Sequence, residues 1–492
     1  MDAILYWNEV SLEANRVSHT NGKGEQTGPT LSSRALAIVH LAMYDAYAGV
    51  SNDPTNLPPY LDLSSLLPPD LVASADAAVA AAAHATLSSL FPSQRPFFDL
   101  ILAGAGDMSN PGHAFGLAVA QQILADRAGD PDAGASGYVT SPARGRHRPD
   151  PDNPGQGFHA PFYGAQSKGF AITARHELAA PPFDNDEYKD ALREVRGKGI
   201  APELMGTLPP HIKPRTVDET LIGIFWGYDG AAELGTPPRL YNQIVREVAL
   251  NKPNPNTGNP NTPAENARLF AFVNVAMADA GILAWDQKYI HDFWRPVVGI
   301  REHDKSMGPA ATQADNNISN NCDSSWLPLG APNSNRIGKN FTPNFPAYPS
   351  GHATFGAAAF HITRLFYGVS AGDRARDDVF KDLMSNDLDF VSDEFNGVTT
   401  DNKGAVRPRH LRNFADGLWQ MIEENGRSRI DLGVHWVFDA FVVKDDGTPD
   451  LPRTDAAGKL FGGVPLGLQI AEDIFLAGGG KAPSKSTVGP RP

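Results

Sequence analysis

The spacing of apolar residues along the chain is mostly that of helices. In RALAIVHLAMYDAYAG, residues 34–49, apolar side chains recur every three or four positions and so share one helical face. Similar patterns predict helices over 71–91, 113–128 and 350–367, and another from about residue 216. No alternating run of apolar and polar residues is long enough to require a sheet. The pattern predicts an all-α fold with bundle packing.

Two helices carry terminal signals. A helix over 262–294 is predicted to begin at Thr262, an N-cap residue with a glutamate three positions later as its capping partner. A helix over 408–424 is expected to end at Asn425-Gly426, a common stop signal.

Long irregular segments divide the helical regions. Residues 129–165 and 303–349 are dense in Gly, Pro, Asn and Asp, and loops of this length are uncommon unless they are functional or connect units. The chain has 492 residues, which is more than one hydrophobic core usually organises. We therefore expect an N-terminal helical unit over 1–200, a C-terminal helical unit over 201–478 and a flexible tail over 479–492.

Charge and composition exclude several classes of protein. The chain carries 42 Lys and Arg against 56 Asp and Glu, so a nucleic-acid partner is not expected. No apolar run reaches the roughly 18 residues of a membrane-spanning helix, so membrane insertion is not expected either. The first residues lack a basic region followed by an apolar stretch, which predicts a soluble protein without a signal peptide, either cytoplasmic or exported by a non-standard route. Cys322 is the only cysteine, which rules out an intrachain disulfide and a cysteine-rich zinc site.

The first candidate cluster contains two cations. Lys288 and Arg295-Pro296 are separated by seven residues, or about 700° of helix, so both cations would project from nearly one face, roughly 10 Å apart. Aromatic residues, among them Trp285, surround them. A solvated pair of cations at a helix end is the alternative interpretation.

The second cluster is the tetrad Pro349-Ser350-Gly351-His352 before an apolar helix. Free backbone N–H groups and the positive end of the helix dipole gather at such a terminus and suit an oxyanion. The serine hydroxyl and the histidine would lie beside that anion. The alternative is a serine N-cap with an incidental histidine.

The third cluster contains Arg429, His435 and Asp439. Arginine is a forked donor for phosphate-like oxygens, and histidine can be a nucleophile or a metal ligand. If the segment is helical, Asp439 lies one turn after the imidazole and could orient it. A core histidine with a surface Arg and Asp is the alternative.

Taken together, three cations, a helix N-terminus and two histidines describe an oxyanion pocket. The patterns K-x6-RP, PSGH and SR-x5-H-x3-D resemble the signature shared by vanadium-dependent haloperoxidases and the acid phosphatase/lipid phosphate phosphatase superfamily. YWNEVSLEANRVSHT from residue 6, FWGYDGAAELGTPPRLYNQIV from 225 and FPAYPSGHATFG from 345 are similar to fungal-type vanadium chloroperoxidases. The similarity extends from residue 4 to about 475.

This resemblance implies two four-helix bundles with long connecting loops and one vanadate per chain in the second bundle. The histidine that algal-type bromoperoxidases carry at the position of Phe345 is absent here, which favours the chloroperoxidase branch. The implied site residues are His435 as vanadium ligand; Lys288, Arg295, Ser350, Gly351 and Arg429 around the vanadate oxygens, with Lys288 also polarising peroxide; His352 as acid–base group; Asp229 as partner of Arg429; and Trp285 and Phe345 on the halide side.

The implied reaction is oxidation of chloride, bromide or iodide by hydrogen peroxide to hypohalous acid, which halogenates small organic acceptors. An acid phosphatase with a phosphohistidine intermediate at His435, whose leaving group His352 would protonate, is the alternative. A non-catalytic helical scaffold that binds an anion is a third interpretation. The sequence leaves open an oligomer, the physiological substrate and the choice between chloride and bromide.

Overall fold

The structure is a computed structural model that describes residues 2–374 and 388–492. Within these ranges the regular secondary structure is helical apart from one short antiparallel pair, β1 with β2, in which Leu388 pairs with Phe414. The all-α prediction is confirmed. The helices are α1 (Ala3–Ser18), α2 (Gly28–Ser51), α3 (Ala75–Leu90), α4 (Arg95–Ala105), α5 (Pro111–Asp126), α6 (Tyr163–Gln166), α7 (Asp186–Lys198), α8 (Val217–Phe225), α9 (Pro237–Asn251), α10 (Pro263–His291), α11 (Pro296–Arg301), α12 (Gly351–Phe366), α13 (Gly417–Asp431), α14 (Val437–Ala440) and α15 (Gly463–Ala477), and the strands are β1 (Leu388–Phe390) and β2 (Arg412–Phe414).

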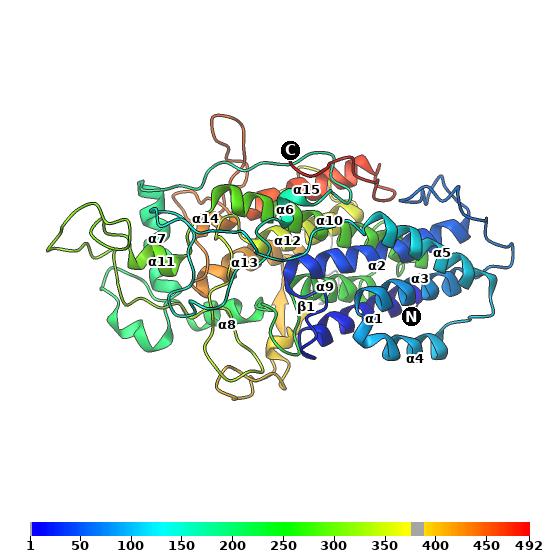
Figure 1. The fold of residues 1–492 in the computed structure, drawn as a ribbon, viewed down its shortest axis with the longest axis horizontal. Coiled ribbons are helices and arrows are strands. Elements are labelled where there is room, and N and C mark those ends of the chain that lie inside the picture. The colour runs from blue at the N-terminus through cyan, green and yellow to red at the C-terminus, as the bar shows by residue number, and fades with distance from the viewer. Residues whose placement is uncertain (1, 375–387) are drawn as a thin grey trace.

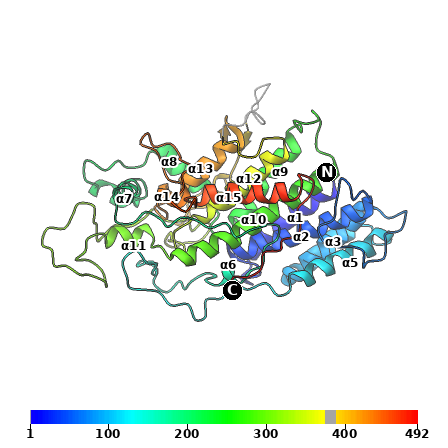
Figure 2. The ribbon, with the colours of Figure 1, turned by 90° about the horizontal axis from the view of Figure 1, so that it is seen from above.

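Helix α10 runs through the middle of the molecule. It packs against α2 on the side of the N-terminal helices and against α12 and α15 on the other side. Helices α1 to α5 gather at one end of the elongated molecule, and α7, α8, α11, α13 and α14 lie toward the other (Figures 1 and 2). One end each of α10, α12 and α13 lies toward the end of the molecule that holds α7, α8, α11 and α14 and several long loops (Figures 1 and 2).

The predicted start of the long helix is confirmed. Thr262 accepts a hydrogen bond from the Glu265 amide, and the Glu265 carboxylate accepts one from the Thr262 amide, which is a complete capping box. The helix ends earlier than predicted, at His291, because Asp292 adopts a left-handed conformation with φ of 48°. Its length and composition would suit a membrane span, yet 94% of its most apolar window is buried inside the protein, as in a core helix.

The helix predicted over 408–424 is present only from Gly417 onward, and both its predicted start and its predicted end are wrong. Residues Arg412–Phe414 form β2, and α13 continues through Asn425 and Gly426 to Asp431. The Asn425 side chain donates to the carbonyl of His352 at 2.8 Å. A Cβ at Gly426 would lie 3.0 Å from the ring of Phe441, so a side chain at this position would crowd that ring. Both residues of the apparent stop signal therefore serve tertiary contacts.

The C-terminal segment differs from the flexible tail expected from the sequence. The amide of Ser486 donates to the carbonyl of Phe170, and the amide of Gly169 donates to that of Val488, both at 2.9 Å. Arg491 forms an ion pair with Asp286 of α10 at 2.7 Å. The polar and glycine-rich composition of this segment suggested disorder. In the structure, Ser486 and Val488 hydrogen-bond to the segment that follows α6, and Arg491 pairs with α10.

The division of the chain near residue 200 stays a prediction. One cluster of buried apolar side chains runs through both halves, and α7, assigned to the N-terminal unit, packs against α11, α13 and α14. The two long loops are as expected: residues 127–162 and 302–350 contain no helix or strand. The number of bundles likewise stays a prediction.

Close packing of α3 against α5 depends on Gly116. A Cβ at this position would overlap the carbonyl oxygen of Ala78 in α3, so the helices must separate. Gly116→Ala is expected to destabilise the protein by about 1–3 kcal/mol, as overpacking does, and to lower its thermal unfolding midpoint. The matched control is Gly104→Ala in α4, where a Cβ meets nothing within 4 Å and the midpoint should hold or rise. Equal midpoints for the two variants would contradict this account of the α3–α5 contact.

Candidate active site

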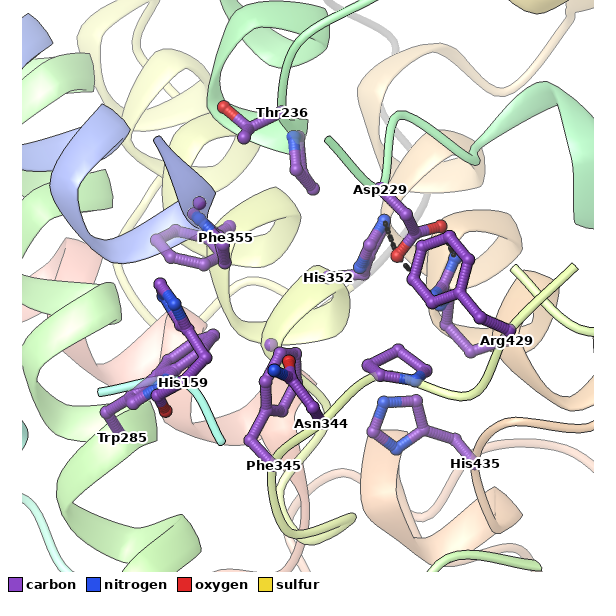
Figure 3. Close-up of a pocket in the computed structure, with 16 residues that line it drawn as sticks. His159, Asp229, Thr236, Trp285, Asn344, Phe345, His352, Phe355, Arg429 and His435 are labelled. Atoms are coloured by element: carbon purple, nitrogen blue, oxygen red, sulfur yellow. Dashed lines mark hydrogen bonds and ion pairs between the residues drawn. The ribbon is translucent and has the colours of Figure 1, made fainter. Parts of the chain in front are cut away.

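Residues of all three sequence clusters line one cavity of about 130 Å³, although Lys288, Arg295 and Ser350 are not among the lining residues. Arg429 lies in the last turn of α13, His435 follows in the connection to α14, and His352 lies in the first turn of α12. Figure 3 shows Arg429 and His435 on one side of the cavity and Trp285 and His159 on the other, with His352 and Phe345 between them. The lining residues are Gly28, Pro29, His159, Asp229, Thr236, Pro237, Trp285, Phe341, Pro343, Asn344, Phe345, Gly351, His352, Phe355, Arg429 and His435.

His435 presents an unprotonated ring nitrogen to the cations. Its Nδ1 donates to Oδ2 of Asp439 at 2.7 Å, and its Nε2 accepts from Nη1 of Arg295 at 2.9 Å. Asp439 is fixed in turn by the amide of Trp436 at 3.0 Å. This network assigns the proton to Nδ1 and makes Nε2 the unprotonated nitrogen; it can bind a metal once Nη1 of Arg295 gives up its hydrogen bond to it. The predicted contact of Asp439 with the imidazole is present.

Electrostatics keep this imidazole neutral. Burial, followed by the nearby Arg295 and Lys288, lowers the pKa of His435 well below its ordinary value. Burial also raises the pKa of Asp439 to about 7. A neutral imidazole is the form that binds a metal.

Arg295 and Arg429 have donors that the protein does not use. Arg295 donates through Nε to the carbonyl of Phe345 at 2.8 Å and through Nη1 to that of Val434 at 2.7 Å. Arg429 forms a two-bond ion pair with Asp229, at 2.9 and 2.7 Å, as the softer part of the resemblance implied. Among the described residues, the buried Nη2 of Arg295 and Nε of Arg429 have no hydrogen-bond partner. Such donors fit a bound oxyanion, which would satisfy both.

Lys288 reaches the site by a different route from the one predicted. Because α10 ends at His291, Lys288 and Arg295 do not share a helical face; Arg295 instead caps α11. The Lys288 ammonium donates to the carbonyls of Pro346 at 2.9 Å, Ala347 at 3.1 Å and Pro349 at 2.5 Å. Its three hydrogens hold the loop before Ser350, and a direct contact with an oxyanion requires one of them to change acceptor.

Unlike Arg429, the cations Lys288 and Arg295 are not neutralised by carboxylates of the described residues. In the described part of the chain, neither Lys288 nor Arg295 has a carboxylate within 4.0 Å. Burial is the main cause that lowers the pKa of Arg295 to about 9 and that of Lys288 well below its ordinary value. A buried anion would reverse both effects, which is the electrostatic reason that this pocket suits one.

The start of α12 supplies further donors. Ser350 is its N-cap, and its Oγ accepts from the amide of Ala353 at 3.4 Å. The amide of Gly351 belongs to the first turn, where backbone donors have no partner within the helix. His352 donates from Nε2 to the carbonyl of Gly227 at 2.8 Å, which makes Nδ1 the basic nitrogen of the neutral ring. Burial, with a contribution from Arg429, lowers the pKa of His352 to about 3.

The opposite end of the cavity is aromatic. The ring centroids of Trp285 and Phe345 lie 4.8 Å apart, and the ammonium of Lys288 lies 5.0 Å from that of Phe345. His159, which sequence reasoning missed, packs against both rings at 5.9 and 6.2 Å. The sequence indicated only that His159 belongs to the long loop over 129–165. It gave no reason to prefer this residue over any other in that loop.

Comparisons with known proteins agree with this geometry. The family model described as "Vanadium chloroperoxidase N-terminal domain" matches residues 1–103, and "VCPO second helical-bundle domain" matches 268–448. The vanadium chloroperoxidase of Curvularia inaequalis is 35% identical over 99% of this chain and 92% of its own length.

Two solved structures share the fold at lower identity. The first bacterial vanadium-dependent iodoperoxidase is 18% identical, with a TM-score of 0.56 over 95% of each chain. The holo-type bacterial vanadium-dependent chloroperoxidase is 16% identical, with a TM-score of 0.60 over 92% of this chain and 93% of that one. Together with the identity to the Curvularia enzyme across nearly the whole sequence, the comparisons establish that this chain belongs to the vanadium chloroperoxidase family.

Proposed function

We propose that this chain is a vanadium-dependent haloperoxidase that oxidises chloride, bromide and iodide with hydrogen peroxide to hypohalous acid. It would hold one vanadate per chain and halogenate small organic acceptors. The observation that carries the proposal is the unprotonated Nε2 of His435, which contacts Arg295, together with donors of Arg295 and Arg429 that have no partner among the described residues. The enzyme from Curvularia, named as a vanadium chloroperoxidase, supports the same cofactor and reaction.

The residues divide the binding of vanadate between them. His435 would ligate vanadium, and Arg295, Arg429 and the start of α12 would donate to its oxygens. When bound, vanadate supplies a Lewis acid that polarises a peroxide oxygen toward attack by halide. The charge of Lys288 and Arg295, held 5.0 and 4.9 Å from the centre of the Phe345 ring, stabilises negative charge at the same place.

His352 is placed to move a proton. Its Nε2 hydrogen is held by the carbonyl of Gly227, so the ring can accept a proton from peroxide only at Nδ1. Asp229 lies 3.9 Å from Nε2 and would stabilise the imidazolium that forms. The low pKa of His352 keeps the ring in the accepting form at neutral and mildly acidic pH.

Chloride oxidation is the finer part of the proposal. Trp285 and Phe345 form an apolar wall beside the cations, so a halide there would be partly desolvated and a better nucleophile. Phe345 adds no titratable group to this wall, as the resemblance to chloroperoxidases implied.

The deciding experiment measures two reactions on the same preparation. After loading with orthovanadate, the protein should oxidise bromide and chloride with peroxide. The oxidation is measured as halogenation of monochlorodimedone. Hydrolysis of p-nitrophenyl phosphate should be confined to the vanadate-free protein, because phosphate and vanadate compete for one pocket. Inhibition by vanadate without any gain of halide oxidation would instead identify a phosphatase.

His435→Ala should abolish both vanadate retention and halogenation, because it removes the only ligand that bonds to the metal. Retention can be measured as vanadium remaining with the protein after gel filtration. His211→Ala, at an exposed position, is the control and should match the unaltered protein. Undiminished monochlorodimedone bromination by the His435 variant would refute the ligand assignment.

His352→Ala should separate catalysis from binding. Loss of a general acid–base group should lower kcat for chloride oxidation by roughly 100-fold or more. The dissociation constant of vanadate should change far less, because the metal ligand and both arginines remain. A variant that loses vanadate and activity in equal measure would assign His352 to cofactor binding.

A further inference from the structure

The imidazole of His159 forms part of the aromatic end of the active-site cavity. It comes from the loop between α5 and α6, in the N-terminal half of the chain, whereas Trp285 and Phe345 come from the second half. The three rings pack together with centroid distances of 4.8 to 6.2 Å. Figure 3 shows His159 beside Trp285, across the cavity from His435.

The position of this ring is fixed by its surroundings. The carbonyl of His159 accepts from Tyr289 Oη at 2.8 Å and from Trp285 Nε1 at 3.3 Å. Gly28, with φ of +77°, lies against the ring, and a Cβ there would overlap Cε1 of His159. The absence of a side chain at residue 28 therefore makes room for the imidazole.

The hydroxyl of Thr30 determines which nitrogen carries the proton. Thr30 Oγ1 lies 3.0 Å from Nε2 of His159, and its hydrogen has no other acceptor among the described residues. We assign the hydroxyl as the donor to Nε2, since this gives its hydrogen an acceptor, and the ring proton then lies on Nδ1. In the described chain no hydrogen-bond partner of Nδ1 is found, and the residue lines the cavity.

The charges around this end of the cavity favour an anion. Lys288 and Arg295 lie 5.0 and 4.9 Å from the centroid of Phe345. Gly28 and Pro29, the first residues of the 24-residue helix α2, line the same end and bring the positive end of its dipole. Burial lowers the pKa of His159 to about 4, so at neutral pH the ring is an uncharged donor.

We propose that Nδ1–H of His159 donates a hydrogen bond to the halide held against Trp285 and Phe345. His159 is then a specificity-determining residue that the N-terminal half contributes to the site, and Thr30 is the residue that positions its proton. The inference rests on the proposed haloperoxidase function and identifies the donor that holds the substrate anion.

Two substitutions at residue 159 test the donor. His159→Leu removes it, whereas His159→Asn carries an amide N–H at the position of Nδ1. In the vanadate-loaded enzyme, KM for bromide should rise roughly 10-fold to 100-fold in the leucine variant, as expected for the loss of a hydrogen bond to an ion. It should stay within about threefold in the asparagine variant, while KM for peroxide and the affinity for vanadate hold in both. An unchanged bromide KM in the leucine variant would overturn the proposal.

Thr30 provides an independent pair. Thr30→Val cannot donate to Nε2, so the ring can move its proton to that nitrogen, and KM for bromide should rise. Thr30→Ser keeps the hydroxyl and should behave as the unaltered enzyme. Equal bromide KM values for the two variants would contradict the assigned proton position.

Bromide soaked into crystals gives a readout that needs no turnover. An anomalous-scattering peak is expected within hydrogen-bond distance of Nδ1 in the unaltered protein and in His159→Asn, and a weaker peak in His159→Leu. A peak of equal height in all three would overturn the inference. If the unaltered, vanadate-loaded protein oxidises no halide, the proposed function fails, but the peak still tests anion binding at His159.

Discussion

Buried positive charge without matching negative charge is the constraint on which the active site depends. Lys288, Arg295 and Arg429 lie almost completely out of water, and of the three only Arg429 has a carboxylate partner among the described residues. Removing an ion from water costs several kcal/mol even after relaxation. The protein offsets this cost with backbone carbonyls at Lys288 and Arg295, but two guanidinium donors have no partner in the part of the chain that the structure describes. An oxyanion completes this arrangement, and a neutral molecule of the same shape would not.

The helical fold serves this constraint through helix ends. The last turns of α10 and α13 place Lys288 and Arg429 near carbonyl-rich termini, where cations are favoured, and the first turn of α12 presents amide donors, where anions are favoured. His435 and Asp439 lie in the connection and the short helix that follow α13, so the histidine is fixed by a neighbour in sequence. The helices thus supply opposite polarities to one small volume.

The N-terminal half is part of the site as well as part of the core. Its buried apolar residues join those of the second half in one cluster, and α2 and the loop after α5 bring Gly28, Pro29 and His159 to the cavity. The cationic end is therefore built by the second half alone, whereas the aromatic end is shared between both halves.

The sequence by itself determined the all-α fold, the long loops and the members of the cationic cluster, because helical periodicity and short motifs are local properties. His435 and Asp439 could be paired from their spacing for the same reason. The tertiary structure decided what depends on distant residues. Asp292 adopts a left-handed conformation and ends α10. Lys288 and Arg295 are therefore separated by a turn of the chain and do not share the helical face that was predicted. The contacts of Asn425 with His352 and of Gly426 with Phe441 could not be read from the apparent stop signal, because they depend on how the chain folds back on itself. His159 entered the site only through folding, since a residue in a long loop has no periodicity to indicate what it faces.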